Sequence, residues 1–321
     1  MIHFINRKYF VCTLLTILLI FPSLLYSQYK NRQQKREKIQ VPINCLQGEY
    51  QLLWQDEFEG SQLDTSIWRT AYGNPKPWDC TLPRKECGTE LQLYQANNVE
   101  LSDGTLKLIA RKEAILYNGI YGEDHTCANR IKGDSFNLAF DYTSGAIETK
   151  SNKIAFQYGR FEIRCRLPVG AGMWPAFWLW GGGGATGRAG EIDILEIFSS
   201  DQPIYTTSVH NGNKKARVDK VIDWNIQEWH TYSAEWEPTV IKYYIDNQLI
   251  RTYQRFKKVN CKEASSSARR SLRRNDAFPW KQWMVLRLNL ALNPEDGMAV
   301  TSDTPFPSLM EVDYVRIYQK N

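Results

Sequence analysis

Short runs of alternating hydrophobic and polar residues recur along the chain from Tyr50 onward, separated by Gly, Asn, Asp and Pro. Alternation with a period of two is typical of strands that bury one face and leave the other in solvent or in a cleft. No long stretch has the 3.6-residue period of an amphipathic helix. The pattern predicts strands over residues 51–58, 98–101, 105–110, 145–149, 159–167, 174–180, 191–198, 205–210, 230–237, 240–245, 283–292 and 311–318.

Many short strands with turn residues between them favour an antiparallel sandwich or barrel. We expect an all-β antiparallel β-sandwich of the jelly-roll type, in which one concave face stays open as a cleft. In one strand, Arg160, Glu162 and Arg164 alternate with Phe161 and Ile163. The polar side of that strand therefore lines either solvent or the cleft.

The first 27 residues have the features of a secretory signal peptide, since Arg7 and Lys8 precede an apolar stretch over residues 10–26 and small Ser27 follows it. The alternative is an uncleaved membrane anchor. Pro22 interrupts the stretch, however, and its length is near the lower limit for a membrane span. We expect a secreted, periplasmic or cell-surface protein with no stable membrane insertion after cleavage.

Residues 28–49 are basic, rich in Gln and aperiodic, which is typical of a linker. One catalytic domain is expected over residues 50–321. Six of the seven cysteines follow the predicted signal peptide, and an oxidising destination permits disulfides among them. No cysteine pair has zinc-ligand spacing with a matching His. Cys165 alternates with Phe161 and Ile163 and is expected to be a buried free thiol, and all other pairings stay open.

The 13% aromatic content, with eleven Trp and seventeen Tyr, supplies flat aromatic faces that suit sugar rings, although strands also favour aromatic residues. The formal net charge of +5 is concentrated in residues 30–38 and 257–274. Neither basic run interleaves aromatics as a nucleic-acid platform does, so both are interpreted as solvated, and we expect no nucleic-acid partner.

Residues 190–198 carry three carboxylates, Glu191, Asp193 and Glu196, among β-branched residues that favour a strand. In a regular strand Glu191 and Asp193 share one face, and Glu196 points to the other. A β-bulge at Ile194-Leu195 would accommodate one extra residue and return Glu196 to the first face. The spacing therefore predicts a bulge and three carboxylates that converge on one surface.

Neighbouring carboxylates raise one another's proton affinity. A retaining glycosidase depends on this mutual effect on proton affinity, because it uses one ionised nucleophile and one protonated acid that are about 5 to 5.5 Å apart. We assign Glu191 as the nucleophile, Asp193 as the residue that tunes it, and Glu196 as the acid and base. The alternative is that these residues form an exposed polar strand face with no catalytic role.

The segment from Glu191 to Glu196 resembles the bulged E-x-D-x-x-E motif of glycoside hydrolase family 16, the laminarinase-like jelly-roll enzymes. The resemblance covers about residues 50 to 319. It implies a retaining endo-hydrolase of a polysaccharide, with Glu191 as nucleophile and Glu196 as acid/base. Other segments that match the family in order include Trp54–Phe58, Leu63–Trp68, Glu90–Tyr94, Tyr158–Glu162, Trp174–Trp178, His230–Trp236 and Val312–Tyr318.

The resemblance also implies substrate-binding residues. Asn98, Glu162 and Arg164 match positions that hydrogen-bond sugars on the non-reducing side of the scissile glycosidic bond. Trp174 and Trp178 can present ring faces to a sugar, with core packing as the alternative for Trp178.

His210 matches a cleft histidine near the acid/base of similar enzymes, with a capping or core role as the alternative. Some relatives bind a structural calcium, and Glu57, Gly104 and Asp313 match its oxygen ligands. Catalysis itself is expected to need no cofactor.

We expect a neutral β-1,3-linked or mixed-linkage glucan as substrate, with an agar- or carrageenan-type galactan as the next candidate. The basic insert 257–276 would favour a sulfated or carboxylated glycan if it bordered the cleft. The Gly-rich run 181–190 also departs from the laminarinase pattern. The same scaffold could instead serve a transglycosylase or a carbohydrate-binding protein without catalysis, although a replaced catalytic Glu would mark the second. We expect a monomer.

Overall fold

The computed structural model describes residues 48–70, 90–120, 135–181, 190–200, 202–212, 214–255, 277–279, 282–295 and 297–320, all of them in one compact unit. The predicted signal peptide, nearly all of the predicted linker, the basic insert and most of the Gly-rich run lie outside these residues, as do all the cysteines except Cys165. Within the described residues, no helix is long and apolar enough to cross a membrane.

Every segment that the alternation predicts as a strand forms one. These strands are β1 (Tyr50–Asp56), β4 (Val99–Ser102), β5 (Thr105–Ile120), β7 (Ala146–Thr149), β8 (Gly159–Arg166), β9 (Met173–Trp180), β10 (Gly190–Phe198), β11 (Ile204–Asn211), β13 (His230–Trp236), β14 (Val240–Ile245), β16 (Val285–Leu292) and β17 (Ser308–Lys320).

The described residues contain further strands that the sequence analysis missed: β2 (Trp68–Thr70), β3 (Gln92–Tyr94), β6 (Ser135–Ser144), β12 (Lys214–Val221) and β15 (Gln248–Gln254). Two of these have only three residues, too few for a periodic signal, and β12 is mostly exposed and polar. One short 3₁₀ helix, η2 (Ala96–Asn98), precedes β4.

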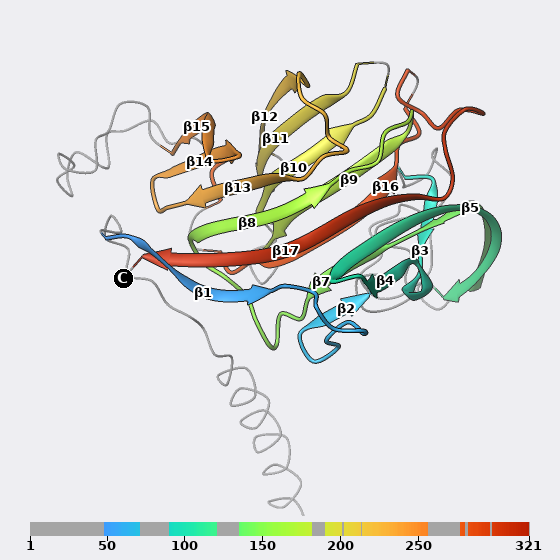
Figure 1. Cartoon of the computed structure of the whole chain (residues 1–321), viewed down its shortest axis with the longest axis horizontal. Coiled ribbons are helices and arrows are strands. Elements are labelled where there is room, and N and C mark those ends of the chain that lie inside the picture. The colour runs from blue at the N-terminus through green and yellow to red at the C-terminus, as the bar shows by residue number, and fades with distance from the viewer. Residues whose placement is uncertain are drawn as a thin grey trace, which may run out of the picture. The chain divides into compact units, whose positions relative to one another are not determined.

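Within the described residues the strands form a ten-stranded sheet and a seven-stranded sheet. The ten-stranded sheet has the order β15-β14-β13-β8-β17-β5-β6-β3, with β1 added at β17 and β4 at β5. The seven-stranded sheet has the order β12-β11-β10-β9-β16-β7-β2. In Figure 1, β8 and β17 of the first sheet lie in front of β9 and β10 of the second. The predicted sandwich is confirmed, and only the β3–β6 pair among the described pairings is parallel.

The core lies between the two sheets and is made by the inward positions of their strands. Phe161, Ile163 and Cys165 of β8 are fully buried in one cluster with Phe177 and Leu179 of β9. Cys165 is therefore the buried free thiol that the alternation predicts. Burial raises the pKa of this thiol well above its ordinary value, which makes Cys165 an unreactive core residue.

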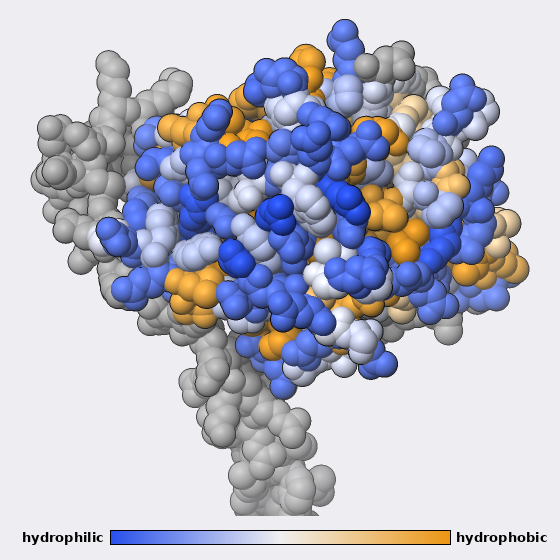
Figure 2. Space-filling model, viewed as in Figure 1, coloured by the Kyte–Doolittle hydropathy of each residue, from blue (hydrophilic) through white to orange (hydrophobic). Residues whose placement is uncertain are grey.

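The polar positions of β8 point away from the core, onto the outer face of the ten-stranded sheet. Arg160 donates two hydrogen bonds to Glu162, and Arg164 pairs with Asp313 of β17. Figure 2, viewed from this side, shows a surface that is mostly hydrophilic with scattered hydrophobic residues. Because this face is on the opposite side of the core from β10, the polar alternation in β8 marks the outer, ion-paired face of the ten-stranded sheet and not the cleft.

Gly145 lies between β6 and β7, where the chain passes from one sheet to the other, and neighbouring backbone atoms leave no room for a side chain there. A Cβ atom there would lie 2.3 Å from the Asn98 carbonyl oxygen and 3.0 Å from the Leu108 Cα, and backbone atoms cannot move aside cheaply. We expect Gly145→Ala to destabilise the protein by about 1–3 kcal/mol or more, measured as a lower Tm. The matched control is Gly60→Ala, whose new Cβ would meet nothing closer than 3.4 Å. Equal Tm values for the two variants would contradict this packing.

Candidate active site

β10 contains the bulge that the carboxylate spacing predicts. Against β11, Glu191 pairs with His210 and Asp193 with Ser208, but the register then shifts before Glu196. The pairing with β9 shifts at the same place, between Asp193 and Leu195. The neighbouring positions Ile192, Ile194, Leu195 and Ile197 are fully buried in the core. The extra residue thus turns the carboxylates of Glu191, Asp193 and Glu196 to the outer face of the seven-stranded sheet.

The strand registers arrange the side chains of this face in rows that cross the sheet. Because adjacent strands lie about 4.8 Å apart, residues paired across strands are close neighbours. From β9 through β10 and β11 to β12, the rows are Trp180–Glu191–His210–Lys215, Trp178–Asp193–Ser208–Arg217 and Ala176–Glu196–Thr206–Asp219.

A hollow of about 270 Å³ lies over these rows. The three carboxylates and His210 form its base, and the rings of Trp174 and Phe198 contribute to its lining. The two rings contact each other at a tilt of 34°, with their centroids 4.8 Å apart. Lys215 and Arg217 of β12 also line the hollow.

Each carboxylate has a positioned hydrogen-bonding partner. Ser208 Oγ donates a short bond to Asp193 Oδ2. His210 Nε2 lies 3.2 Å from Asp193 Oδ2 and 3.4 Å from Glu191 Oε1. Trp174 Nε1 donates to Glu196 Oε1 at 3.1 Å. These contacts hold the three acidic groups in a defined geometry before any substrate arrives.

Burial raises the pKa of both glutamates. The pKa of Glu191 rises to about 9, because of burial first and then the neighbouring charges of Asp193 and Glu196, with Arg287 opposing the rise. The pKa of Glu196 rises to about 8 through burial and Asp193, against the lowering effect of the Trp174 hydrogen bond. The carboxyl groups of one hollow therefore cannot all be ionised near neutral pH, and the set retains a proton that a general acid can donate.

The structure brings together five residues that the sequence analysis singled out: Glu191, Asp193, Glu196, Trp174 and His210. Trp178 lies on the same face but is only 8% exposed. Its Nε1 donates to Asn289 Oδ1 at 2.8 Å, and the Arg287 guanidinium lies 4.8 Å from its ring centroid. Packing, the alternative interpretation for Trp178, is the role that the structure supports.

Three predicted sugar contacts need correction. Glu162 and Arg164 lie on the outer face of the ten-stranded sheet, across the core from the carboxylates. Asn98 is 1% exposed, and its Nδ2 donates to the Ile109 carbonyl and to Thr143 Oγ1. It therefore holds the end of η2 against β5 and β6. The alternation showed that Glu162 and Arg164 share a polar face, but it contained no information on which sheet they would join.

The residues proposed for calcium do not fit a divalent ion in this arrangement. Both carboxylate oxygens of Glu57 accept hydrogen bonds from Arg316 at 2.8 Å, and Asp313 is bonded to Arg164. Gly104 lies in the turn between β4 and β5 with φ of 72°. Calcium needs several oxygen ligands that are free of other cations. In the part of the chain that the structure describes, the group spaced to hold a metal is Glu191, Asp193 and His210, within the candidate active site itself.

The sequence analysis also missed Phe198, Lys215 and Arg217, which line the hollow, and buried Ser208, which donates to Asp193. Ser208 could have been found, because it precedes His210 by two positions in the same predicted strand and so shares its face. Lys215 and Arg217 could not, since their strand was not predicted and its pairing with β11 is a tertiary contact.

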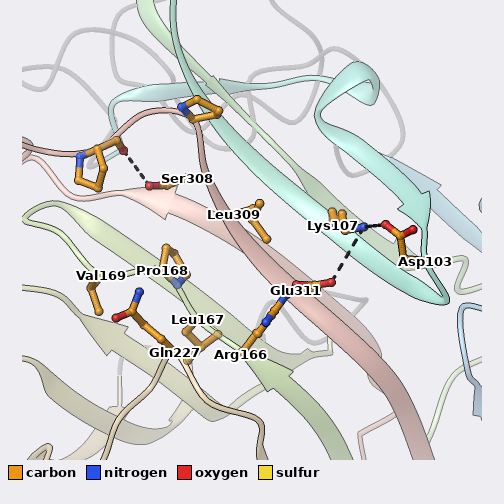
Figure 3. A pocket seen from close by; sticks show the side chains of 12 residues that line it. Asp103, Lys107, Arg166, Leu167, Pro168, Val169, Gln227, Ser308, Leu309 and Glu311 are labelled. Atoms are coloured by element: carbon orange, nitrogen blue, oxygen red, sulfur yellow. Dashed lines mark hydrogen bonds and ion pairs between the residues drawn. The ribbon is translucent and has the colours of Figure 1, made fainter.

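A second hollow of about 530 Å³ lies along β17 on the ten-stranded sheet (Figure 3). Its acidic groups are already paired with cations: Glu311 with Arg166, and Asp103 with Lys107. The pKa of Asp103 is lowered by its hydrogen bond to Lys107. This hollow is larger, but both acidic residues of its lining are in ion pairs, so we expect the chemistry in the first hollow.

The family model described as glycosyl hydrolases family 16 matches residues 88–268, more than half of the chain. Glucan endo-1,3-beta-glucosidase A1 of Niallia circulans is 30% identical over 84% of this chain, which spans 38% of that protein. Beta-glucanase of Rhodothermus marinus is 29% identical over 84% of this chain and 85% of its own length. The solved catalytic domain of an endo-1,3-beta-glucanase (laminarinase) from Thermotoga petrophila RKU-1 matches with a TM-score of 0.63 and 27% identity, over 85% of this chain and 99% of that one.

Clustered carboxyl groups of raised pKa should make stability depend on pH. In the unfolded chain a glutamate titrates at about 4.3, so the folded state binds these protons more strongly. The stability they contribute is present at low pH and is lost as pH rises toward their folded pKa values. We expect Glu191→Gln and Glu196→Gln to raise Tm by a few degrees at about pH 8 and by clearly less at about pH 5.

The measurement is thermal unfolding across this pH range, with exposed Glu59→Gln as the control. A Tm difference between variant and wild type that stays constant with pH would contradict the raised pKa values.

Proposed function

Because the chain belongs to glycosyl hydrolase family 16, we propose that it hydrolyses internal β-glycosidic bonds of a polysaccharide with net retention of anomeric configuration. The observation that carries this proposal is the bulged strand β10, which places Glu191, Asp193 and Glu196 together in one hollow. The similarity to the laminarinase domain extends over nearly all of that domain, in agreement with the predicted jelly-roll sandwich.

In the first step, Glu191 in its ionised form attacks the anomeric carbon while Glu196 donates its proton to the glycosidic oxygen. The bond from the anomeric carbon to that oxygen breaks, and a covalent glycosyl ester forms on Glu191. The carboxyl group of Asp193 contacts Ser208 and His210 and shares a hydrogen bond with Glu191. Its charge and this hydrogen bond both raise the pKa of Glu191, so Asp193 tunes the proton affinity of the nucleophile.

In the second step, Glu196 is ionised and takes a proton from water, whose oxygen attacks the same carbon from the opposite side to Glu191. The ester bond breaks, Glu191 recovers its charge, and Glu196 regains the proton that it needs for the next cycle. Two inversions give net retention. The Trp174 hydrogen bond to Glu196 favours the ionised form that accepts this proton.

The proposed substrate is a β-1,3-linked or mixed-linkage glucan. It is supported by the names of the relatives, which are a glucan endo-1,3-beta-glucosidase, a beta-glucanase and a laminarinase. The rings of Trp174 and Phe198, which contact each other, offer the hollow an aromatic wall for sugar rings. A secreted or cell-surface location, proposed from residues 1–27, would bring the enzyme to polymers that are too large to enter a cell.

We expect the purified protein to release oligosaccharides from laminarin, with the β-anomer formed first by NMR. Glu191→Gln and Glu196→Gln should each lower kcat by about 10²–10⁴ or more, whereas Glu59→Gln should not. Azide should restore turnover to Glu191→Ala with an α-glycosyl azide as product, and to Glu196→Ala with a β-glycosyl azide. Polysaccharide binding without hydrolysis by the wild type would instead identify a binding protein.

The Trp174 hydrogen bond predicts a specific change in the pH profile. Trp174→Phe keeps an aromatic ring but removes the donor that lowers the pKa of Glu196. The pKa of Glu196 should rise, so the alkaline limb of kcat against pH should move to higher pH. Trp224→Phe, which removes a hydrogen bond to Tyr232 elsewhere in the protein, is the matched control. A shift to lower pH, or equal profiles for the two variants, would contradict this role of Trp174.

A further inference from the structure

β12 forms one edge of the seven-stranded sheet and presents cations on both of its faces. Lys220 lies on the face away from the hollow, with its Nζ 4.8 Å from the Trp224 ring centroid. Lys215 and Arg217 have the opposite parity and line the hollow that contains the carboxylates. Lysines on an edge strand commonly prevent pairing with another chain, which accounts for exposed lysines such as Lys214 but not for two cations directed into an active site.

The register fixes where these two cations lie relative to the chemistry. Lys215 pairs with His210 and Arg217 with Ser208, each one strand further from β10. Two strand spacings, about 10 Å in all, therefore separate them from Glu191 and Asp193. A sugar that extends from the carboxylates across β11 would carry its substituents to Lys215 and Arg217.

Contacts inside the protein leave Lys215 available, and they leave the Nη groups of Arg217 available although its Nε is in an ion pair with Asp219. Arg217 Nε donates to Asp219 Oδ1 at 2.6 Å, and its guanidinium lies 4.8 Å from the Phe198 ring centroid. The Nη groups make no hydrogen bond with the described residues, although the side chain is held in place. Lys215 is exposed, and within the same described residues it makes neither a hydrogen bond nor an ion pair.

The cations also act against the acid step. The charges of Lys215 and Arg217 lower the pKa of Glu196, which has to be protonated to act as the general acid. This effect has the same direction as that of the Trp174 hydrogen bond, which already favours the ionised form of Glu196. A ligand that carries negative charge on this side would give the two cations a role of their own.

We propose that Lys215 and Arg217 form a subsite for an acidic substituent, a sulfate ester or a carboxylate, on sugars bound at the β12 side of the carboxylates. The proposal rests on the hydrolase function above and adds β-glycans with acidic substituents to the substrates that the hollow can bind. The guanidinium of Arg217 can bind such a group through two parallel hydrogen bonds, and Lys215 adds a flexible point charge. The carboxylates repel a negatively charged substituent and so keep it at the β12 end of the hollow. This repulsion is only partly screened there, because the distance of about 10 Å between the cations and the carboxylates is close to the screening length in physiological salt.

The test measures binding separately from hydrolysis. In the Glu196→Gln protein, calorimetry compares three laminarin oligosaccharide preparations: unmodified, sulfated, and oxidised to carboxylates at C6. We expect at least one acidic preparation to bind about tenfold more tightly than the unmodified one, and the arm that does so identifies the substituent. Adding Lys215→Gln or Arg217→Gln should abolish this preference, whereas Lys220→Gln on the other face of β12 should keep it.

Equal binding of all three preparations, or a preference that survives both Lys215→Gln and Arg217→Gln, would overturn the subsite. Loss of the preference in the Lys220→Gln control would do so as well, since it would show that only the general charge of β12 matters. The release of oligosaccharides from unmodified laminarin by the wild type is measured in a separate assay. Failure there would remove the proposed glucanase activity, whereas selective binding of an acidic glycan in the same protein would leave the subsite in place.

Discussion

The candidate site depends on one extra residue in β10. The core between the sheets requires Ile192, Ile194 or Leu195, and Ile197 to point inward, and all of them are fully buried. In a strand without a bulge, this requirement would direct Glu196 into the same core, where an unpaired carboxylate is strongly unfavourable. The bulge satisfies the core and the acidic face together. The sheet thus supplies a rigid platform on which three acidic groups occupy fixed neighbouring positions.

Gathering these groups has an energetic cost, which the neighbouring strands partly offset. Ser208 and His210 of β11 contact Asp193, and Trp174 of β9 donates to Glu196. The partners orient the carboxyl groups without neutralising them, so the pKa of each glutamate stays raised. On the outer face of the ten-stranded sheet, by contrast, ion pairs neutralise the acidic residues. Glu162, Asp313 and Glu57 are each bonded there to an arginine. The contrast between unneutralised and neutralised acids separates the reactive face of the sandwich from its structural face.

The same contrast applies to the cations of β12. Arginines that meet carboxylates in the described residues commonly do so in direct pairs, and Arg217 itself pairs with Asp219, but Lys215 and Arg217 both stand at a distance from the carboxylates of β10. The hollow therefore has an acidic base and a cationic edge. A polysaccharide that crosses it would meet aromatic rings, carboxyl groups and then positive charge, and such a gradient orients a ligand of uneven charge.

The sequence alone determined the strands whose hydrophobic alternation is long enough to detect, the two-sheet architecture, the bulge and the three carboxylates. These are local properties, because parity along a strand depends only on neighbouring residues. It could not determine which sheet a polar face belongs to. Glu162 and Arg164 were therefore placed at the substrate, and Asn98 was expected at a sugar although it is buried. Lys215 and Arg217 became visible only through the pairing of β12 with β11. Strand order and register are set by contacts between residues far apart in the chain, and only the tertiary structure decides them.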